Sequence, residues 1–371
     1  MKMRMNRILW KKQAAPVPVA EVDMVFELNE NKVVLGLSGG VDSTLAALKL
    51  KEKGLAVTGV YLNVLNDKEG QKLAFNSALE LDIPLVVKDI KENFDNKVIS
   101  YFETEYLKGR TPNPCVVCNP DIKFSILKEV ADSLGAKYIA TGHYAKTYYD
   151  VDLKRWFIKK AVSEERDQSY MLYRLPEEVI SRLLMPLGDV LDKDIVRREA
   201  EKAKLSSAGK KDSQEICFLR EGQAYSEFLK ERGVVTPGGP FLDLEGNVIG
   251  KHSGISNYTI GQRKGLGNTF GKPMFVKEIK RDDNAIVLSD KEQDLYSYKI
   301  ISSNNIIRIP FEGLKVMGKI RYRAQPSSCY IRPLENNKIE ALFDEPQRAP
   351  TPGQSIVFYL EDYIIAGGFI D

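Results

Sequence analysis

The chain has 371 residues, of which 43% are hydrophobic and 28% charged, and its formal net charge at pH 7 is +3. Because a single core stops growing near about 250 residues, this length predicts more than one domain. No apolar run approaches the roughly 18 residues that span a bilayer, which excludes an integral membrane protein. The nearly balanced charge permits an anionic partner such as RNA without requiring one.

The first segment, residues 1–30, is predicted to be an N-terminal extension. It has five basic residues in its first twelve, followed by the linker-like "AAPVPV". The basic residues interrupt the apolar core of a secretory signal, so we expect a cytoplasmic protein with a frayed tail. A transit-like or nucleic-acid-contacting arm is the alternative.

From Lys32 the sequence alternates apolar runs with helix-like runs. "KVVLGLSGG" is followed by "VDSTLAALKLKEKG" and "LAVTGVYLNV", and the alternation continues to "FSILKEVADSLG" and "KYIATGHYA". Strands that alternate with helices of this length predict a parallel sheet with helices on both faces. We therefore expect an α/β domain over residues 31–211.

The motif "LSGGVDST" (residues 37–44) is placed where the first strand ends and the first helix begins. Gly39 and Gly40 allow backbone N–H groups to turn toward an anion, and the helix N-terminus favours negative charge at the same point. Asp42 can cap the helix or hold a magnesium ion that is bound to phosphates. The alternative is a glycine turn that caps an ordinary helix.

No lysine follows these glycines, so the motif is not a Walker loop. It resembles the SGGxDS loop of the PP-loop ATP pyrophosphatases, which cleave ATP between the α and β phosphates and adenylate a substrate oxygen. The resemblance implies ATP and Mg²⁺ as cofactors. The nucleotide site that it implies consists of Gly36, Leu37, Ser38, Gly39, Gly40, Val41, Asp42 and Ser43.

Two of the four cysteines lie close together in "GRTPNPCVVCNPDIKF", and a third lies in "KKDSQEICFL". Without a secretion signal, a CxxC pair is more often metal-binding or redox-active than part of a disulfide framework. The surrounding prolines 112, 114 and 120 predict a rigid loop that is neither helix nor strand. A third thiol brought by folding would complete a redox or metal site, and a structural zinc site is the alternative. The fourth cysteine, Cys329, is interpreted as a small buried apolar residue.

After about Ser206 the sequence changes to glycine and proline turns between short segments, and from about Leu295 it consists of short β-rich runs. We expect a small central domain over residues 212–290 and a β-barrel-like domain over residues 291–371. The basic residues of "GQRKGLG" in the central region are suited to contact with RNA.

The segments "GRTPNPCVVCNPDIKF", "ATGHYA", "RDQSYMLYRL", "KKDSQEICF", "TIGQRKGLG" and "KIRYRAQ" occur in the order and context of the tRNA-specific 2-thiouridylases, the MnmA (TrmU) family. The similarity covers roughly residues 31–371. It implies a tRNA-uridine 2-sulfurtransferase, which adenylates the C2 oxygen of the wobble uridine with ATP and replaces it by sulfur, releasing AMP and pyrophosphate. The alternatives are another PP-loop synthetase that acts on a small molecule, or a non-catalytic RNA-binding protein.

The same resemblance assigns roles to the thiols. Cys118 matches the nucleophilic cysteine, and Cys217 matches the one that receives persulfide sulfur from a relay protein or a cysteine desulfurase; the two could form a disulfide during the cycle. Many relatives have aspartate at the position of Cys115. Cys115, Cys118 and Cys217 could instead hold a [4Fe-4S] cluster with one open iron, so Cys115 distinguishes two mechanisms that stay open.

The resemblance also implies contacts with nucleotide and tRNA. Leu62 and Gly142 join the nucleotide site, although core packing is the alternative for Leu62. Capping of a helix is the alternative for Asp167 and for Asp212 in "KKDS", and His252 is interpreted as a surface residue. The tRNA contacts that the resemblance implies are Asn113, Pro114, Cys115, His143, Arg166, Asp167, Gln168, Arg321, Tyr322 and Gln354.

Overall fold

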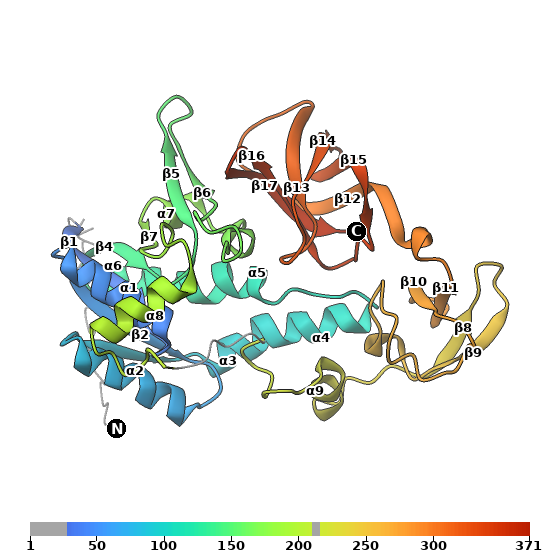
Figure 1. Ribbon diagram of the computed structural model, residues 1–371, viewed down its shortest axis with the longest axis horizontal. Helices are drawn as coiled ribbons and strands as arrows, with labels where there is room; N and C mark the ends of the chain where they lie inside the picture. Colours follow the sequence, from blue (N-terminus) through green and yellow to red (C-terminus); the bar gives the residue numbers. More distant parts are fainter. Residues whose placement is uncertain (1–27, 210–215) are drawn as a thin grey trace, which may run out of the picture.

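The computed structural model describes residues 28–209 and 216–371, so residues 1–27 of the predicted N-terminal extension and "KKDS" lie outside the described residues. Its first unit contains a parallel sheet with the strand order β3-β2-β1-β4-β7 (Figure 1). The predicted α/β class is confirmed. The strands of this sheet are β1 (Asn29–Gly36), β2 (Ala56–Asn63), β3 (Leu85–Asp89), β4 (Ala136–Ala140) and β7 (Leu183–Leu184).

Helices cover both faces of this sheet. Alternate residues of a strand point to opposite faces, so neighbouring residues of β1 pack against different helices. Val33 and Leu35 of β1 pack in one apolar cluster with residues of α1 and α8. Val34 packs in another cluster with Leu127 of α6. The helices of this unit are α1 (Val41–Glu52), α2 (Lys68–Glu80), α3 (Lys91–Phe94), α4 (Ser100–Leu107), α5 (Cys115–Cys118), α6 (Ser125–Ser133), α7 (Glu177–Ile180) and α8 (Lys193–Lys202).

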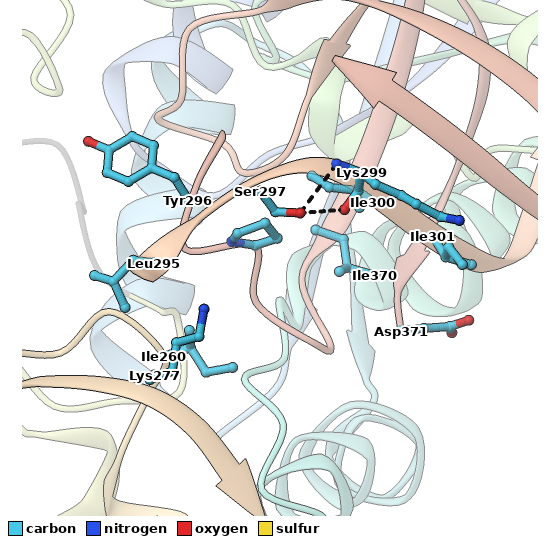
Figure 2. A pocket seen from close by; sticks show the side chains of 11 residues that line it. Ile260, Lys277, Leu295, Tyr296, Ser297, Lys299, Ile300, Ile301, Ile370 and Asp371 are labelled. Atoms are coloured by element: carbon cyan, nitrogen blue, oxygen red, sulfur yellow. Dashed lines mark hydrogen bonds between the residues drawn. The ribbon is translucent and has the colours of Figure 1, made fainter. Parts of the chain in front are cut away.

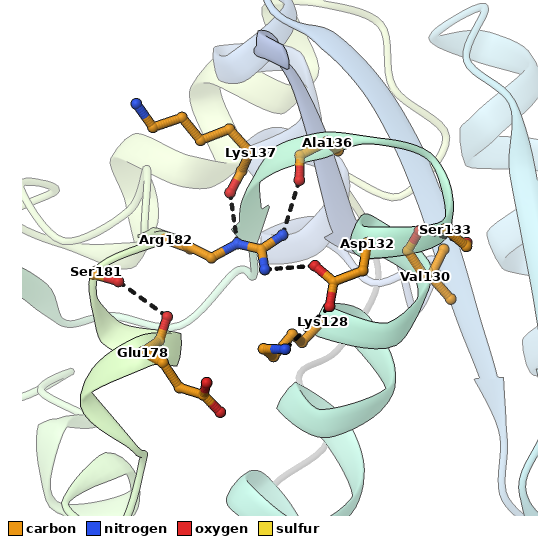
Figure 3. Close-up of polar contacts among 9 residues, drawn as sticks. All are labelled: Lys128, Val130, Asp132, Ser133, Ala136, Lys137, Glu178, Ser181 and Arg182. Carbon is orange, nitrogen blue, oxygen red and sulfur yellow. Dashed lines mark hydrogen bonds and ion pairs between the residues drawn. The ribbon is translucent and has the colours of Figure 1, made fainter. Parts of the chain in front are cut away.

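Arg182 compensates for the shortness of β7, which has only two residues (Figure 3). Its guanidinium group donates hydrogen bonds to the carbonyl oxygens of Ala136 (2.9 Å) and Lys137 (2.8 Å) and pairs with Asp132 of α6 at 2.6 Å. Asp132 also pairs with Lys128, one turn earlier on the same helix. These bonds hold the edge of the sheet against α6.

The cysteine segment is helical, so the prediction of a loop that is neither helix nor strand was wrong. α5 is followed by a π-helical turn over Asn119–Phe124 and then by α6. Pro114 is the N-cap of α5, and Pro120 lies at the start of the π turn. A proline is tolerated at the N-cap because its missing N–H would have no partner within the helix, whereas Pro120 lies inside the continuous helical stretch of residues 115–133 and removes one hydrogen bond where the π turn begins.

The central region contains an antiparallel hairpin of β8 (Gly239–Leu242) and β9 (Val248–His252) and a second hairpin of β10 (Phe275–Lys280) and β11 (Ala285–Ser289). β8 and β11 pair in parallel and join the two hairpins in one sheet. The short helix α9 (Tyr225–Glu231) precedes this sheet.

The interpretation of His252 as a surface residue was wrong, because it is only 4% exposed. Its Nε2 lies 3.1 Å from the carbonyl oxygen of Asn284, and its Nδ1 accepts a hydrogen bond from the Gly254 N–H at 3.1 Å. Both ring nitrogens are therefore satisfied inside the central unit.

The C-terminal strands form a closed barrel in the order β12-β15-β14-β13-β16-β17, with β12 paired to β17 (Figure 1). Cys329 is fully buried in its core, as predicted. The hairpin of β5 (Lys146–Asp150) and β6 (Arg155–Lys159) extends the barrel sheet through the pairing of Lys159 with Tyr363. The barrel strands are β12 (Tyr296–Ile307), β13 (Leu314–Lys319), β14 (Ser327–Leu334), β15 (Lys338–Arg348), β16 (Ser355–Leu360) and β17 (Tyr363–Ile370).

A cavity of about 230 Å³ lies at the junction of the central sheet and the barrel (Figure 2). Ile260 and Lys277 line its central side, and the first residues of β12 and the C-terminal Asp371 line its barrel side. The Lys277 ammonium group donates to the carbonyl oxygen of Asp294, and Lys299 pairs with Glu340. Both ammonium groups that line the cavity are therefore paired within the protein.

The expected domain boundaries at residues 211 and 290 stay predictions, and the first of them falls outside the described residues. No helix in the described ranges is long and apolar enough to cross a membrane.

Candidate active site

The glycine motif forms a tight turn between β1 and α1. Gly39 has φ +76°, and a Cβ atom there would lie 2.5 Å from the backbone of Leu73 in α2, so the turn requires glycine. Gly40 is the N-cap of α1, with no capping side chain. The first N–H groups of α1 have no partners within the helix and can bind an anion.

Hydroxyl groups of the motif hold the turn in shape. The Ser38 N–H donates to Ser43 Oγ at 3.2 Å, and Ser43 Oγ donates to the Gly40 carbonyl at 3.0 Å. Thr44 Oγ1 also lies 3.0 Å from the Gly40 carbonyl oxygen and 3.0 Å from Ser77 Oγ of α2. The loop is therefore preorganised by its own side chains.

Asp42 does not cap α1, since the N-cap is Gly40. Its Oδ1 atom instead accepts hydrogen bonds from the Tyr144 hydroxyl and from the Lys193 ammonium group, each at 2.6 Å. Neither Tyr144 nor Lys193 was found by sequence reasoning. Lys193 lies 151 residues from Asp42, and no spacing in the sequence connects the two.

Gly142 brings the end of β4 against the phosphate loop. A Cβ atom at Gly142 would lie 2.9 Å from the backbone carbon of Asp42 and the backbone nitrogen of Ser43. Ligands of open α/β sheets bind at this carboxyl edge. Leu62, near the end of β2, lies at the same edge and packs partly buried against the core.

The thiols of Cys115 and Cys118 belong to one helical turn. The Cys115 N–H donates to Asn113 Oδ1 at 3.1 Å, and the Cys118 N–H donates to the Pro114 carbonyl at 2.9 Å. Both cysteines are partly buried, and all three cysteines of the candidate site are free thiols. Asn113 and Pro114 therefore fix the start of the helix that carries both sulfur atoms.

Cys217 is positioned by the next residue. Phe218 is 5% exposed, and its ring packs against Phe94, Phe102 and Phe228 at centroid distances of 5.9, 5.2 and 5.1 Å. Sequence reasoning missed this aromatic cluster because its members come from two distant regions, residues 94–102 and 218–228. The cluster anchors Cys217 next to α4.

The three thiols interact electrostatically. Burial raises the pKa of Cys118 to about 11 and that of Cys217 to about 12, although Cys217 is the most exposed of the three residues. The thiols of Cys115 and Cys118 raise the pKa of Cys217 further. The three thiols therefore lie within electrostatic reach of one another, and burial raises the pKa of each.

Lys123 is a central residue of this cluster that sequence reasoning missed. Its positive charge lowers the pKa values of Cys115, Cys118 and Cys217, against the larger effect of burial. It lies in the π-helical turn Asn119–Phe124, and π-helical turns are frequent at functional sites. The lysine is adjacent to the CxxC pair in the sequence, so its place in "NPDIKF" was the signal that could have identified it.

His143 connects the thiol cluster to the nucleotide edge. Its Nδ1 lies 2.8 Å from Thr141 Oγ1, and its ring stacks on Phe124 at a centroid distance of 5.9 Å. Burial holds the pKa of His143 well below its ordinary value, and Lys123 lowers it further. The imidazole is therefore neutral at physiological pH.

Two of the predicted tRNA contacts in the barrel bind backbone atoms of the protein. The Gln354 side chain donates to the Thr111 carbonyl at 2.9 Å, just before the cysteine segment. Arg321 donates to the carbonyl oxygens of Arg348 and Ala349 at 2.8 and 2.6 Å. The ring of Tyr322 lies 6.3 Å from that of Tyr170, with the Lys319 ammonium group 5.7 Å from its centroid.

The segment Arg166–Gln168 is built around a buried carboxylate. Asp167 is 5% exposed and accepts hydrogen bonds from the Ala161 N–H and from the N–H and hydroxyl of Ser169. Gln168 Oε1 accepts from the Tyr144 N–H at 3.0 Å. Arg166 is partly exposed. The segment thus touches Tyr144, which in turn binds Asp42 of the phosphate loop.

A metal site was tested against the donor atoms of the structure. Among the residues that the structure describes, no group of three or more His, Cys, Asp or Glu side chains is arranged to hold a metal ion. The three thiols therefore do not form a ready-made site for an iron-sulfur cluster. For Mg²⁺, the carboxylate of Asp42 at the N-terminus of α1 is a suitable hard oxygen ligand.

Three family models match the chain in succession. They are the tRNA methyl transferase HUP domain over residues 31–221, the tRNA methyl transferase PRC-barrel domain over residues 226–290 and the aminomethyltransferase beta-barrel domain over residues 302–370. The tRNA-specific 2-thiouridylase MnmA of Acetivibrio thermocellus is 43% identical over 92% of this chain and 100% of its own length. The chain belongs to the tRNA-specific 2-thiouridylase family.

Other 2-thiouridylases of the family show the same level of similarity. MnmA 1 of Caldanaerobacter subterraneus subsp. tengcongensis is 45% identical over 93% of this chain and 99% of its own length, and MnmA of Clostridioides difficile is 43% identical over 92% and 98%. Among solved structures, the NMN synthetase of Francisella tularensis aligns with a TM-score of 0.32 at 19% identity, over 54% of this chain and 78% of its own. That overlap is too small to bear on the fold.

Proposed function

We propose that this protein is an ATP-dependent tRNA-uridine 2-sulfurtransferase that converts the wobble uridine of tRNA to 2-thiouridine. The observation that carries the proposal is that residues of the two candidate sites follow one another directly at the end of β4. Gly142 lies against Asp42 and Ser43 of the phosphate loop, and the next residue, His143, lies within the electrostatic reach of Lys123, which acts on all three thiols. This arrangement supports a nucleotide site and a sulfur site at one edge of the sheet.

In the first step the loop over Gly36–Ser43 binds the phosphates of ATP through the N–H groups at the start of α1. Asp42 would hold Mg²⁺, which neutralises phosphate charge when bound. The C2 oxygen of the uridine forms a bond to the α-phosphorus, and the bond to pyrophosphate breaks with its electron pair on pyrophosphate. The uracil N3 proton leaves, which keeps the adenylated base neutral. Gly142 gives the nucleotide room, and Leu62 supplies an apolar contact.

In the second step the terminal sulfur of a Cys217 persulfide attacks C2, and AMP leaves with the electron pair of the C2–O bond. Cys118, as a thiolate, then attacks the Cys217 sulfur atom, which breaks the sulfur–sulfur bond with its electron pair on the sulfur bound to C2. The base anion takes up a proton from solvent at N3 and becomes 2-thiouridine. The resulting Cys118–Cys217 disulfide is reduced by an external thiol. The sulfur donor is a persulfide relay protein or a cysteine desulfurase.

We propose the persulfide route over the [4Fe-4S] route because the thiols lack a preformed metal arrangement. In this route Cys115 does not react, and it raises the pKa values of Cys118 and Cys217. We further propose that tRNA lies across the barrel and the cysteine segment in the cytoplasm. Its contacts are Asn113, Pro114, Cys115, His143, Arg166, Gln168, Arg321, Tyr322 and Gln354, with Asp167 holding its segment in shape.

The test is thiolation of unmodified tRNA with ATP and a persulfide donor, after anaerobic purification with quantification of iron and sulfide. We expect no iron, product from the wild type and from Cys115→Ser, and none from Cys118→Ser or Cys217→Ser. Cys329→Ser, in the barrel core, is a control for general effects of cysteine removal.

About four irons per chain, lost together with activity in Cys115→Ser, would instead support the cluster route. Release of pyrophosphate with a small acid and without tRNA would indicate a small-molecule synthetase. A wild-type protein that binds no ATP would contradict the proposed function altogether.

A further inference from the structure

Lys193 places a buried cation at the phosphate loop. Its side chain is only 5% exposed, and its ammonium group lies 2.6 Å from Asp42 Oδ1. The same group lies 5.9 Å from the ring centroid of Tyr144. Burying an ammonium group costs several kcal/mol, roughly, unless it is well paired, and here the Asp42 carboxylate supplies the pairing.

The ion pair is asymmetric. The Asp42 side chain is 32% exposed whereas Lys193 is almost fully covered, so the pair meets solvent on the side of the carboxylate. That side belongs to the first turn of α1, where the N–H groups have no partners within the helix. An anion that approaches the helix N-terminus therefore arrives beside the ion pair.

The helix that carries Lys193 is fixed relative to the loop. Lys193 is the first residue of α8, whose N-cap Asp192 accepts a hydrogen bond from the Ile195 N–H at 2.8 Å. α8 packs against α1, and Lys49 of α1 pairs with Glu199 of α8 at 2.6 Å. The Tyr144 hydroxyl holds Asp42 independently. The ammonium group can therefore change partners while the carboxylate and both helices stay in place.

We propose that Lys193 is the phosphate-binding cation of this site, supplying from α8 the positive charge that the glycine motif itself lacks. In the free protein the ammonium group is paired with Asp42. When ATP occupies the loop, the ammonium group binds a phosphate oxygen, and the Asp42 carboxylate becomes available to Mg²⁺. The proposal rests on the proposed ATP site and adds a residue to it.

The competing explanation is that Lys193 merely neutralises Asp42. The two explanations predict different ATP affinities when Asp42 has been made neutral. If Lys193 only neutralises Asp42, its removal then has no effect on ATP binding. We would measure ATP and adenosine binding by calorimetry with EDTA present, so that any role of Asp42 as a metal ligand drops out. The variants are Lys193→Met, Lys193→Arg, Asp42→Asn and Lys193→Met/Asp42→Asn.

Lys193→Met is expected to weaken ATP binding about 10- to 100-fold, because it removes a charge-assisted hydrogen bond, and to leave adenosine binding within about twofold. Lys193→Arg should retain most of the ATP affinity. Asp42→Asn alone should strengthen Mg²⁺-free ATP binding, since it removes a negative charge near the phosphates. The double variant should stay at least about tenfold weaker than Asp42→Asn.

Lys49→Met is the matched control, because it removes the other ion pair between α1 and α8 at a distance from the loop. It should bind ATP like the wild type. Thermal unfolding of each variant separates loss of a ligand contact from loss of structure, and Lys193→Arg keeps the test valid if Lys193→Met does not fold.

The proposal is overturned if the double variant binds ATP as tightly as Asp42→Asn, or if Lys193→Met weakens ATP and adenosine equally. It is also overturned if Lys193→Met binds ATP like the wild type. In each of these cases a wild type that binds ATP and thiolates tRNA leaves the proposed function standing. A wild type that does not bind ATP defeats both proposals.

Discussion

Lys123 acts on every thiol of the candidate sulfur site. Its charge lowers the pKa of Cys118, which burial raises to about 11, and it has the same effect on Cys115 and Cys217. Only a thiolate is a strong nucleophile. The nearby ammonium group therefore increases the small thiolate fraction from which the proposed attack on the persulfide starts.

Replacing Lys123 with glutamine should raise the pKa of Cys118. In a background where the other three cysteines are serine, alkylation of Cys118 by iodoacetamide at pH 8.5 should slow about 3- to 10-fold. Lys123→Arg should keep nearly the wild-type rate, because it retains the charge. An equal rate in Lys123→Gln and the wild type would show that the ammonium group does not act on this thiol.

The partly buried His143 predicts a dependence of stability on pH. Burial holds its folded-state pKa well below the ordinary value, so the unfolded chain takes up a proton near pH ~6.5 that the folded chain does not. The free energy of unfolding therefore has its full value above that pH. It decreases as the pH falls from there toward the folded-state pKa, because only the unfolded chain binds the proton. Urea unfolding at pH 7.5 and 5.5 should show a smaller loss of stability for His143→Asn than for the wild type. Equal losses in the two proteins would contradict this assignment.

At the scale of elements, β4 and α1 meet so closely that only glycine fits between them. A Cβ atom at Gly142 would lie 2.9 Å from the backbone of Asp42 and Ser43, and backbone atoms cannot move aside as flexible side chains do. The position of the phosphate loop is therefore set by the strand end next to it.

Gly142→Ala should displace the start of α1. We expect a loss of about 1–3 kcal/mol in the free energy of unfolding and weaker ATP binding, measured by denaturation and calorimetry. Gly209→Ala is the control, since a Cβ atom there meets no described residue within 4 Å, and its stability should change by less than ~0.5 kcal/mol. A Gly142→Ala protein with wild-type stability and affinity would contradict the close approach.

Elements whose pattern is local could be predicted from the sequence. The strand, turn and helix around "LSGGVDST" follow from adjacent residues, and so does the barrel core position of Cys329. The helical state of Cys115–Cys118 could not be predicted, because nearby prolines are compatible with both a loop and a first helical turn. Tyr144 and Lys193 reach Asp42 from distant segments, so only tertiary packing brings them to the candidate site.

At the scale of the whole molecule, the barrel holds the segment that leads to the thiols. The Thr111 N–H donates to the Pro352 carbonyl at 2.8 Å, and the Thr111 carbonyl accepts from Gln354 at 2.9 Å. Arg110 donates to the carbonyl oxygen of Ile370, at the end of β17. Two parts of the chain separated by 243 residues therefore form one support.

Gln354→Ala should loosen this support without affecting the nucleotide site. We expect tRNA thiolation at limiting tRNA to fall about 3- to 10-fold, from the loss of one hydrogen bond, with unchanged ATP affinity. A change in the alkylation rate of Cys118 without tRNA would show that Gln354 acts through the segment and not only by touching RNA. Leu342→Ala, on an exposed barrel position, is the control. Wild-type thiolation by Gln354→Ala would argue against both roles.

The bonds from Pro352, Gln354 and Ile370 to the residues before Cys115 also bear on the order in which the protein folds during its synthesis. The glycine turn and its sheet leave the ribosome long before β17. The phosphate loop can therefore form on a nascent chain while the barrel that supports the thiol segment is still missing. We expect the segment before Cys115 to become fixed only after the barrel strands have been translated.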